Sequence, residues 1–347
     1  MKNTTVRFPA EWEPADAVLI AWPHENTDWA YMLPEVRACY AEIIKAIVKR
    51  AKIIIAAPDM PELGFLAEDE RERVIYFPVL TNDTWTRDYG PITTVASDGI
   101  LHFNDFKFNG WGLKFAADKD NLVTSQLHEC GLLDGIRDNR LSFVLEGGSI
   151  ESDGAGTLLT TADCLLSPNR NGSDSEGQIV NYLKETLGVH TVHMLHYGAL
   201  EGDDTDGHID TLVRIAPPGD VIFYTGCSDT GDVRHYKQLH DMFNELQQLR
   251  TAAGLPYHLI ELPMPEPVYD PEDGHRLPAT YANFLILNGA VLLPVYGQPL
   301  HDMTATMAIK AAMPDYEVVP IDCSALIRQH GSLHCATMQL PKGSLSL

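Results

Sequence analysis

Residues 281–321 read YANFLILNGAVLLPVYGQPLHDMTATMAIKAAMPDYEVVPI. Two apolar runs within 281–296 flank an Asn-Gly dipeptide, the preferred turn of a tight hairpin, and so predict a strand–turn–strand pair. A helix is expected next, over 302–313, with Asp302 as its N-cap and a proline directly after its end. The last run, 316–321, is rich in Val and Ile, which favour strands. This stretch therefore predicts one module, made of a strand pair, a helix and a third strand.

The same order of elements recurs along the chain. Helices with one apolar face are expected at 34–50, 119–130, 175–187, 234–252 and 302–313. A β-type run follows each helix, at 52–58, 140–146, 190–195, 257–262 and 316–321. Strand pairs are expected at 91–103, 148–160, 208–225 and 281–296, and a fifth pair is split between the chain ends, at 15–22 and 332–340.

A regular spacing, here about 70 residues, is typical of propellers and other repeat arrays. We therefore expect residues 1–347 to form one closed α/β unit of five modules and not two domains. An ordinary α/β sheet with antiparallel edges is the alternative.

The composition excludes several classes of protein. The 347 residues include 48 Asp and Glu against 25 Lys and Arg, a net charge of −23, so nucleic acid is not an expected partner. The acidic surface favours solubility, and it could also attract small cations. No apolar run approaches the roughly 18–20 residues of a membrane helix, and the first residues lack the apolar centre of a signal peptide. A cytoplasmic protein without a membrane partner is expected, and a homo-oligomer stays an open alternative.

Six cysteines occur without any CxxC pair, which argues against a zinc ribbon or a disulfide framework. Most should be reduced packing residues, and one could be a nucleophile.

The unusual residues cluster where each strand pair begins. These junctions are 82–91, 145–149, 201–210, 275–284 and 330–335. Modules related by rotation would bring equivalent junctions together at one end of the axis. The residues that would then share one pocket are Trp85, Arg87, Asp88, Glu146, His208, Asp210 and Cys335.

The sequence around Cys335 is strand-like, and a lone cysteine is more often a core residue than a catalytic one. Gly331, a few residues earlier, favours the catalytic alternative because a small residue lets the backbone approach a ligand. His334 should point to the opposite strand face and is not the expected base. His208 and Asp210, two residues apart, would share one face of a strand.

A metal site is the main competing interpretation of the acidic cluster at 201–210. As an EF-hand loop it fails, because Gly202 and Val213 would occupy ligand positions 1 and 12. A zinc site would need two further His or Cys ligands at suitable spacing, and there is no HExxH motif. We therefore expect neither a metal nor an organic cofactor.

One thiol, one imidazole and several carboxylates suit reaction at a guanidinium group. Paired carboxylates bind such a flat cation through several N–H donors, and a thiolate can attack its carbon. A histidine can protonate the departing ammonia and then activate water. The intermediate would be an S-alkylthiouronium.

Four ordered motifs, WTRDYGP (85–91), LEGGS (145–149), DGHID (206–210) and GSLHC (331–335), resemble the agmatine deiminase and bacterial-type peptidylarginine deiminase family. This family is a branch of the guanidine-modifying superfamily, and the resemblance covers nearly the whole chain. It implies a pentein-type fold, a five-module α/β propeller with pseudo-fivefold symmetry around a central active site, and a single catalytic domain over 1–347.

The resemblance also implies roles for individual residues. Cys335 matches the nucleophile and His208 the general acid and base. Asp88 and Asp210 match the guanidinium-binding aspartates, Glu146 the supporting glutamate, and Trp85 the tryptophan of the substrate channel. The chain departs from the family pattern at HGSLH, where many members have GGGNIH, and at Tyr89, where plant-type members tend to have a small residue.

Agmatine, a dication without a carboxylate, is the expected substrate, and its products would be ammonia and N-carbamoylputrescine, a step in putrescine biosynthesis. An arginine deiminase should carry a cation for the α-carboxylate, and only Arg87 and Arg276 stand out in the junctions. A rim that includes Asp204 and Asp206, beside Asp203, suits an amine tail, and Gly331 is expected to contact the substrate.

The alternatives are a peptidylarginine deiminase, a deiminase of another small guanidine, a non-catalytic polyamine binder and a carboxylate-bridged metal hydrolase. The stretch 262–281 fits neither helix nor strand and is either a lid over the pocket or a solvated insertion.

Overall fold

The computed structural model describes residues 5–229 and 231–346. Five sheets repeat one pattern, in which a first strand pairs antiparallel with a second and the second pairs parallel with a third. The first strands are β5 (Ile92–Ala96), β8 (Glu151–Ser152), β11 (Val213–Ala216), β16 (Leu285–Leu287) and β19 (Met338–Pro341). The second strands are β6 (Leu101–Lys107), β9 (Thr157–Thr161), β12 (Val221–Thr225), β17 (Ala290–Val295) and β2 (Ala15–Ala21). The third strands are β7 (Ile136–Val144), β10 (Thr191–Leu195), β13 (His258–Leu262), β18 (Glu317–Asp322) and β3 (Lys52–Ala57).

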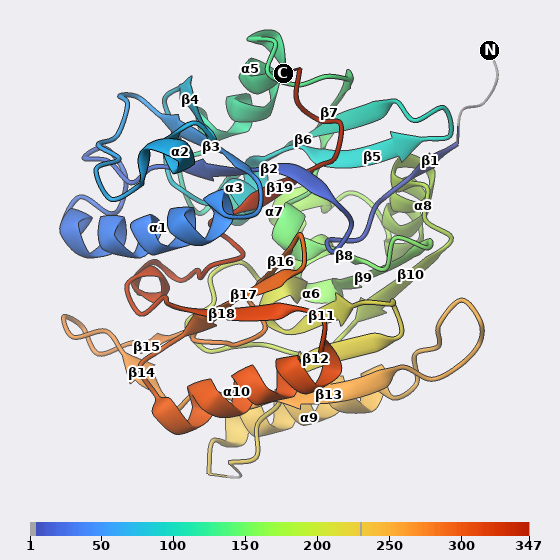
Figure 1. Ribbon diagram of the computed structural model, residues 1–347. Coiled ribbons are helices and arrows are strands. Elements are labelled where there is room, and N and C mark those ends of the chain that lie inside the picture. The colour runs from blue at the N-terminus through green and yellow to red at the C-terminus, as the bar shows by residue number, and fades with distance from the viewer. Residues whose placement is uncertain (1–4, 230, 347) are drawn as a thin grey trace.

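A helix connects the second and third strands of each module and lies on the outside of the molecule (Figure 1). These helices are α1 (Leu33–Val48), α5 (Val123–Glu129), α8 (Glu176–Leu187), α9 (Val233–Leu246) and α10 (Pro299–Ala312). The predicted module and its fivefold repetition are confirmed, and the fold is a five-module α/β propeller.

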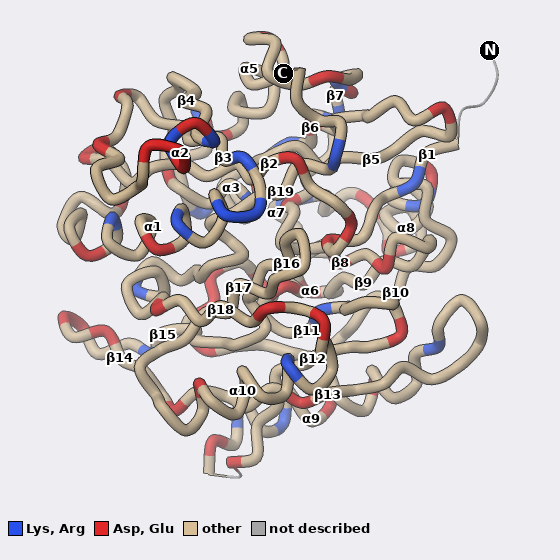
Figure 2. Tube along the Cα trace, viewed as in Figure 1, with Lys and Arg blue, Asp and Glu red and all other residues tan. Residues whose placement is uncertain are grey.

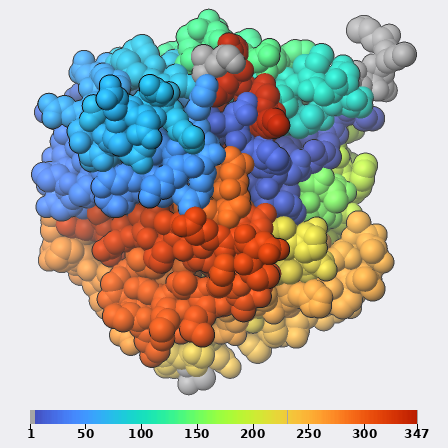
Figure 3. Space-filling model, in the orientation of Figure 1, coloured from blue at the N-terminus to red at the C-terminus, as the bar shows by residue number. Residues whose placement is uncertain are grey.

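The two ends of the chain complete one module. Strand β19 pairs antiparallel with β2, and Met338 lies opposite Leu19. In Figure 3 the red C-terminal segment packs against the blue N-terminal residues. The prediction that the fifth strand pair is split between 15–22 and 332–340 is therefore confirmed, with the C-terminal strand six residues shorter at its start.

The sheets are extended by short strands at two places. β1 (Val6–Arg7) pairs with β5, and β4 (Val74–Pro78) pairs with β3. The remaining short elements are α2 (Glu68–Arg71), α3 (Thr86–Tyr89), α4 (Gly110–Leu113), η1 (Asp120–Leu122), η2 (Gly147–Ser149), α6 (Ala162–Leu165), α7 (Pro168–Asn171), η3 (Ile209–Thr211), β14 (Val268–Tyr269), β15 (Arg276–Leu277) and η4 (Leu326–Gln329).

The start of α10 differs from the prediction. The helix begins at Pro299, three residues before the position expected from Asp302 as N-cap. Proline is well suited to the first helical turn because its missing N–H would have no partner there. The Asp302 carboxylate instead accepts hydrogen bonds from the backbone N–H groups of Gln298 and Tyr296, at 2.8 and 3.1 Å. Asp302 therefore lies within the first turn of α10, and its carboxylate stabilises the loop that precedes the helix.

Buried ion pairs join the modules at the centre. Arg214 of β11 donates to Glu151 of β8 at 3.0 Å and to Glu11 at 2.8 Å, and its own side chain is fully buried. It also donates to the backbone oxygen of Ala282, just before β16. Because an unpaired buried guanidinium would be costly, these partners fix three modules and the N-terminal segment relative to one another. Asp and Glu outnumber Lys and Arg, 48 against 25, and Figure 2 shows residues of both kinds distributed along the trace. None of the described helices is long and apolar enough to cross a lipid bilayer.

Candidate active site

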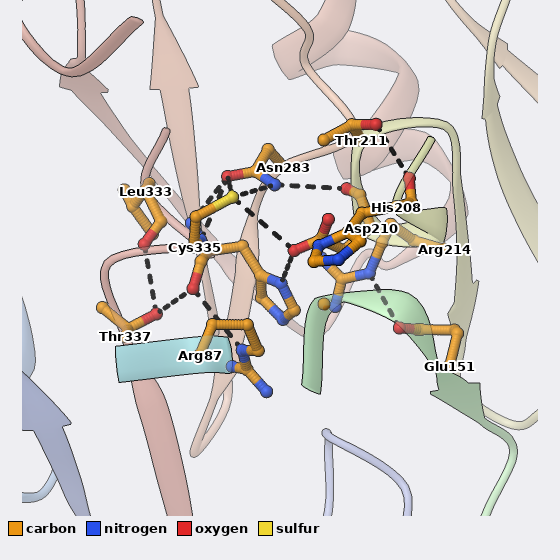
Figure 4. A network of polar contacts seen from close by, with 12 residues as sticks. Arg87, Glu151, His208, Asp210, Thr211, Arg214, Asn283, Leu333, Cys335 and Thr337 are labelled. Carbon is orange, nitrogen blue, oxygen red and sulfur yellow. Dashed lines mark hydrogen bonds and ion pairs between the residues drawn. The ribbon is translucent and has the colours of Figure 1, made fainter. Parts of the chain in front are cut away.

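The junctions before the first strands meet at the centre of the propeller, as the repeat predicts. Asp88 comes from α3, Glu146 from the start of η2, His208 and Asp210 from the turn before β11, and Cys335 from the turn before β19. All five side chains are buried. Figure 4 shows Cys335, Asp210 and His208 facing one another, with Asn283 beside the sulfur.

Cys335 lies in a turn, so the prediction of a strand at this position is wrong. The turn allows the backbone to reverse before β19 and directs the thiol toward Asp210, whose Oδ2 lies 3.8 Å from the sulfur. Burial, together with the charges of Asp210 and Asp88, raises the pKa of the Cys335 thiol well above its usual range. The thiol is therefore protonated at neutral pH as long as no cation lies between the two carboxylates.

Asn283 was missed by the sequence analysis. Its Nδ2 donates to the Cys335 sulfur at 3.2 Å, and its Oδ1 accepts from the backbone N–H groups of His334 and Cys335 at 2.9 and 3.3 Å. The available signal was its place in the fourth junction, 275–284, from which only Arg276 had been considered.

His208 lies between two carboxylates. Its Nδ1 is 3.6 Å from Asp88 and its Nε2 is 3.8 Å from Glu146. The prediction that His208 and Asp210 lie on a strand is wrong, because η3 intervenes and β11 starts only at Val213. Burial opposes the charged imidazolium, but Asp88, the Cys164 thiol and Glu146 favour it and hold the pKa of His208 well above its usual range.

Glu146 is held from the side opposite the cavity. Both of its oxygens accept from Nε of Arg170 at 2.9 Å, and both side chains are fully buried. Burial raises the pKa of Glu146, but His208 and Arg170 outweigh it, and the pKa lies below its usual range. Arg170 was also missed, because its partner lies 24 residues away and the sequence gives no sign of the contact.

Glu146, Cys164 and His208 bring their ligand atoms within 4.8 Å of one another, the one such group of possible metal ligands in the described ranges. The guanidinium of Arg170 already contacts both oxygens of the carboxylate, so a divalent cation there would face a buried positive charge. The arrangement does not fit a metal centre.

Asp88 is oriented by two donors. The Trp111 Nε1–H donates to its Oδ2 at 2.8 Å and the Gly148 N–H donates to its Oδ1 at 2.9 Å. Gly148 cannot be replaced freely, because a Cβ there would lie 2.6 Å from Nδ1 of His208. Asp210 is held at Oδ2, while its buried Oδ1 has no hydrogen-bond partner among the described residues. One buried carboxylate oxygen, on a side chain 3.8 Å from the Cys335 sulfur, is thus left without a partner in the described ranges.

A small cavity is lined in part by Cys335. Its walls include Trp85, Trp111, Phe115, His330 and Gly331. Four aspartates also line it, namely Asp28, Asp83, Asp88 and Asp204, and no Lys or Arg does so among the residues that the structure describes. Burial and neighbouring carboxylates raise the pKa of Asp83 to about 7 and that of Asp204 to about 6. The cavity therefore favours a cation.

The predicted acidic rim is only partly correct. Asp204 lines the cavity, as expected for a residue of the rim. Asp206 does not line it, because its carboxylate pairs with Lys114 and Arg170, each at 2.6 Å. Its prediction as a substrate-binding residue is corrected on this ground. Asp203 accepts from the backbone N–H groups of Thr205 and Gly207 and shapes the loop.

The two arginines considered for a substrate carboxylate are both occupied by groups of the chain. Arg87 is buried, lies 3.6 Å from Glu11 and donates to Gln339 at 2.6 Å. Arg276 pairs with Asp232 at 2.6 Å. Neither lines the cavity, so the interpretation of Arg87 as a support of its loop agrees with its contacts.

The stretch 262–281 contains a small hairpin, β14–β15, so the prediction that it fits no strand is wrong. His275 of this segment stacks on His330 with ring centroids 5.2 Å apart, and Asp270 accepts from Arg328 at 3.2 Å. Since His330 lines the cavity, the hairpin supports one wall.

A pentein-type propeller with a buried thiol, an imidazole and carboxylates at its centre belongs to the guanidine-modifying enzymes, hydrolases that act on guanidino C–N bonds. The comparison with protein families identifies the branch. Residues 7–341 match the Porphyromonas-type peptidyl-arginine deiminase family, and the chain belongs to this family.

Relatives at the level of single proteins are similar over their full length. The agmatine deiminase of Stutzerimonas stutzeri is 33% identical, with 96% of this chain and 95% of that protein covered. A crystal structure named "Putative Arginine Deiminase from Porphyromonas gingivalis" is 50% identical with a TM-score of 0.92, covering 98% and 99% of the two chains. The C. jejuni agmatine deiminase, in a cysteine-to-serine form with substrate bound, is 35% identical with a TM-score of 0.88, covering 99% and 98%.

Proposed function

We propose that this chain is an agmatine deiminase, which hydrolyses agmatine to N-carbamoylputrescine and ammonia and so supplies putrescine biosynthesis. The observation that carries the proposal is the lining of the cavity. A thiol and four aspartates line it, and no Lys or Arg does so within the described ranges. Because every module contributes a junction to this cavity or its support, residues 1–347 act as one catalytic domain.

Substrate binding and thiol ionisation are linked in this mechanism. The guanidinium lies between Asp88 and the free Oδ1 of Asp210, where carboxylates can accept from several of its N–H groups. Its charge offsets the two negative charges that hold the Cys335 thiol neutral, so the thiol loses its proton to solvent as the substrate binds. The thiolate then adds to the guanidinium carbon.

His208 serves both halves of the reaction. As an imidazolium it protonates the departing nitrogen, the C–N bond breaks and ammonia leaves, giving the S-alkylthiouronium on Cys335. The neutral imidazole then takes a proton from water as the water adds to the same carbon. The C–S bond breaks and the thiolate is released, the hydroxyl on the carbon gives its remaining proton to solvent, and the carbon keeps the water oxygen as the ureido carbonyl. Glu146 stabilises the charged imidazole at 3.8 Å.

The amine tail is proposed to lie near Asp204, with Trp85 and Gly331 along the methylene chain. Binding an ammonium ion would favour the charged carboxylate, since it lowers a pKa that burial has raised to about 6. A free-arginine substrate would place a carboxylate in this acidic surrounding, where none of the described Lys or Arg residues lines the cavity and the nearby Lys114 already pairs with Asp206.

A second candidate is a deiminase of free or peptidyl arginine. It is favoured by the names of the family and of the 50% identical P. gingivalis structure. The cavity lining argues for the first candidate.

The direct test is incubation of the protein with agmatine in H₂¹⁸O. We expect equal amounts of ammonia and N-carbamoylputrescine, one ¹⁸O in the ureido group, and no turnover by Cys335→Ser. Absence of product from the wild-type protein, or normal turnover by Cys335→Ser, would refute the proposal.

A further inference from the structure

We propose that His334 is a positioning residue, whose imidazolium links Asp210 to Glu11 and holds Asp210 for guanidinium binding. This inference rests on the proposed function, because it assigns Asp210 to substrate binding. It concerns a residue that the sequence had placed on the wrong face of a strand, away from the reaction.

His334 makes two short contacts with carboxylates from distant parts of the chain. Its Nδ1 lies 2.7 Å from Oδ2 of Asp210 and its Nε2 lies 2.5 Å from Oε2 of Glu11. The exposed fractions of the three side chains are 1%, 0% and 6%, so water does not weaken either contact. Such charge-assisted hydrogen bonds are roughly twice as strong as neutral ones.

The two contacts determine how many protons the ring carries. A neutral imidazole has a single N–H and could donate to only one of the two carboxylates. The other carboxylate would have to be protonated. Burial disfavours the charged form of Glu11, but Arg214, His334 and Arg87 outweigh it and hold the pKa of Glu11 far below its usual range. His334 and Arg214 likewise outweigh burial and hold the pKa of Asp210 below its usual range. Each ring nitrogen lies within hydrogen-bond distance of a carboxylate oxygen, so the geometry points to a ring that donates to both and carries a proton on each nitrogen.

The charges around the ring are consistent with this state. Glu11, Glu151 and Asp210 are three carboxylates in one buried network, and Arg87 and Arg214 are the two guanidinium groups within it. An imidazolium at His334 supplies the third cation.

The ring contacts Asp210 away from the cavity that contains Cys335, which Asp210 itself does not line. His334 does not line the cavity that contains Cys335. It lines a separate cavity, together with Glu11, Arg87 and Glu151. Its bond to Oδ2 of Asp210 fixes that carboxylate and leaves Oδ1 without a partner among the described residues. Its backbone N–H also donates to Asn283, which contacts the Cys335 sulfur.

Two substitutions separate positioning from a general structural role. The amide nitrogen of Asn can replace Nδ1 of histidine, so His334→Asn keeps a donor for Asp210 and loses the one for Glu11. The longer Gln side chain can replace Nε2, so His334→Gln keeps the donor for Glu11 and loses the one for Asp210. Each variant loses one buried charge-assisted hydrogen bond, which makes them matched controls.

We expect KM for agmatine to be about 10- to 100-fold higher in His334→Gln than in the wild-type protein. In His334→Asn, KM for agmatine should rise by less than about threefold. The two variants should melt at similar temperatures, because each loses one buried hydrogen bond. Equal KM values in the two variants, or wild-type values in both, would overturn the inference.

A measurement on the unmodified protein does not depend on turnover or on how the variants fold. In ¹⁵N-histidine-labelled protein at pH 7.5, long-range ¹H–¹⁵N spectra should show both ring nitrogens of His334 protonated, and the signal should vanish in His334→Asn. A neutral tautomer would overturn the inference. If the wild-type protein fails to convert agmatine, the proposed function fails, and this spectrum still decides whether the imidazolium exists.

Discussion

The sulfur of Cys335 lies 3.8 Å from Oδ2 of Asp210, so the thiol faces a carboxylate that is itself ionised. A thiolate there would repel its neighbour. The free protein therefore holds its nucleophile in the neutral form, and a guanidinium supplies the charge that allows ionisation.

The first prediction concerns the reactivity of Cys335 without substrate. Only the thiolate is alkylated, and the pKa of this thiol is raised, so the neutral form persists until the pH rises through that higher value. The rate of Cys335 alkylation by iodoacetamide, followed by peptide mass spectrometry, should increase steadily from about pH 7 to about 9.5. A rate that levels off below about pH 8 would mean that the thiolate is already formed, contrary to this account.

A second prediction tests the contact between Gly331 and Trp85. A Cβ at Gly331 would lie 2.4 Å from the Trp85 ring, so Gly331→Ala must displace the indole that lines the cavity. We expect kcat/KM for agmatine to fall by about 10- to 100-fold, since overpacking of this kind costs about 1–3 kcal/mol. Gly64→Ala is the control, because a Cβ there meets nothing within 4 Å. Unchanged kinetics in Gly331→Ala would show that the ring position is unimportant.

The third prediction concerns the buried pair of Arg170 and Glu146. Arg170→Gln removes the cation that contacts both oxygens of Glu146, and breaking a buried pair costs about 3–5 kcal/mol. The free energy of unfolding should fall by about that amount in urea titrations. Arg50→Gln, which breaks a pair with the exposed Glu317, should cost only about 0–1 kcal/mol. Equal losses in the two variants would refute the importance assigned to the buried pair.

A fourth prediction asks what Asp204 binds. Butylguanidine has the guanidinium of agmatine and a similar chain but no amine. Asp204→Asn should raise KM for agmatine by about tenfold and leave KM for butylguanidine nearly unchanged, because only agmatine has an ammonium ion for the carboxylate to bind. Parallel changes with both substrates would indicate that Asp204 shapes the cavity and does not bind the tail.

The sequence predicted the fold because its local patterns repeat. The Asn-Gly turn within 281–296, the apolar face of 34–50 and the β-type runs after each helix each specify one element, and their common order specified the propeller. Boundaries were less accurate. For example, α9 ends at Leu246 and not near 252, because the apolar face ends there and the chain turns toward a bridge between Arg250 and Pro256.

The site was predicted where reactive residues are close to recognisable motifs. Asp88, Glu146, His208, Asp210 and Cys335 were all brought together as expected. Asn283, Arg170 and Glu11 act through partners far away in the sequence, and such contacts are fixed only by the tertiary fold. The pairing of Asp206 with Lys114 is also fixed by the tertiary fold. It could not be predicted from the acidic residues that surround Asp206 in the sequence. His334 was misjudged because a turn was interpreted as a strand, which reversed the direction of its side chain.

The most direct test of the central claim compares kcat/KM for agmatine, free arginine and an arginine-containing peptide under identical conditions. Four aspartates line the cavity, and no Lys or Arg of the described ranges does so; agmatine should therefore exceed each of the others by about 100-fold or more. A preference for free arginine or for the peptide would contradict the account.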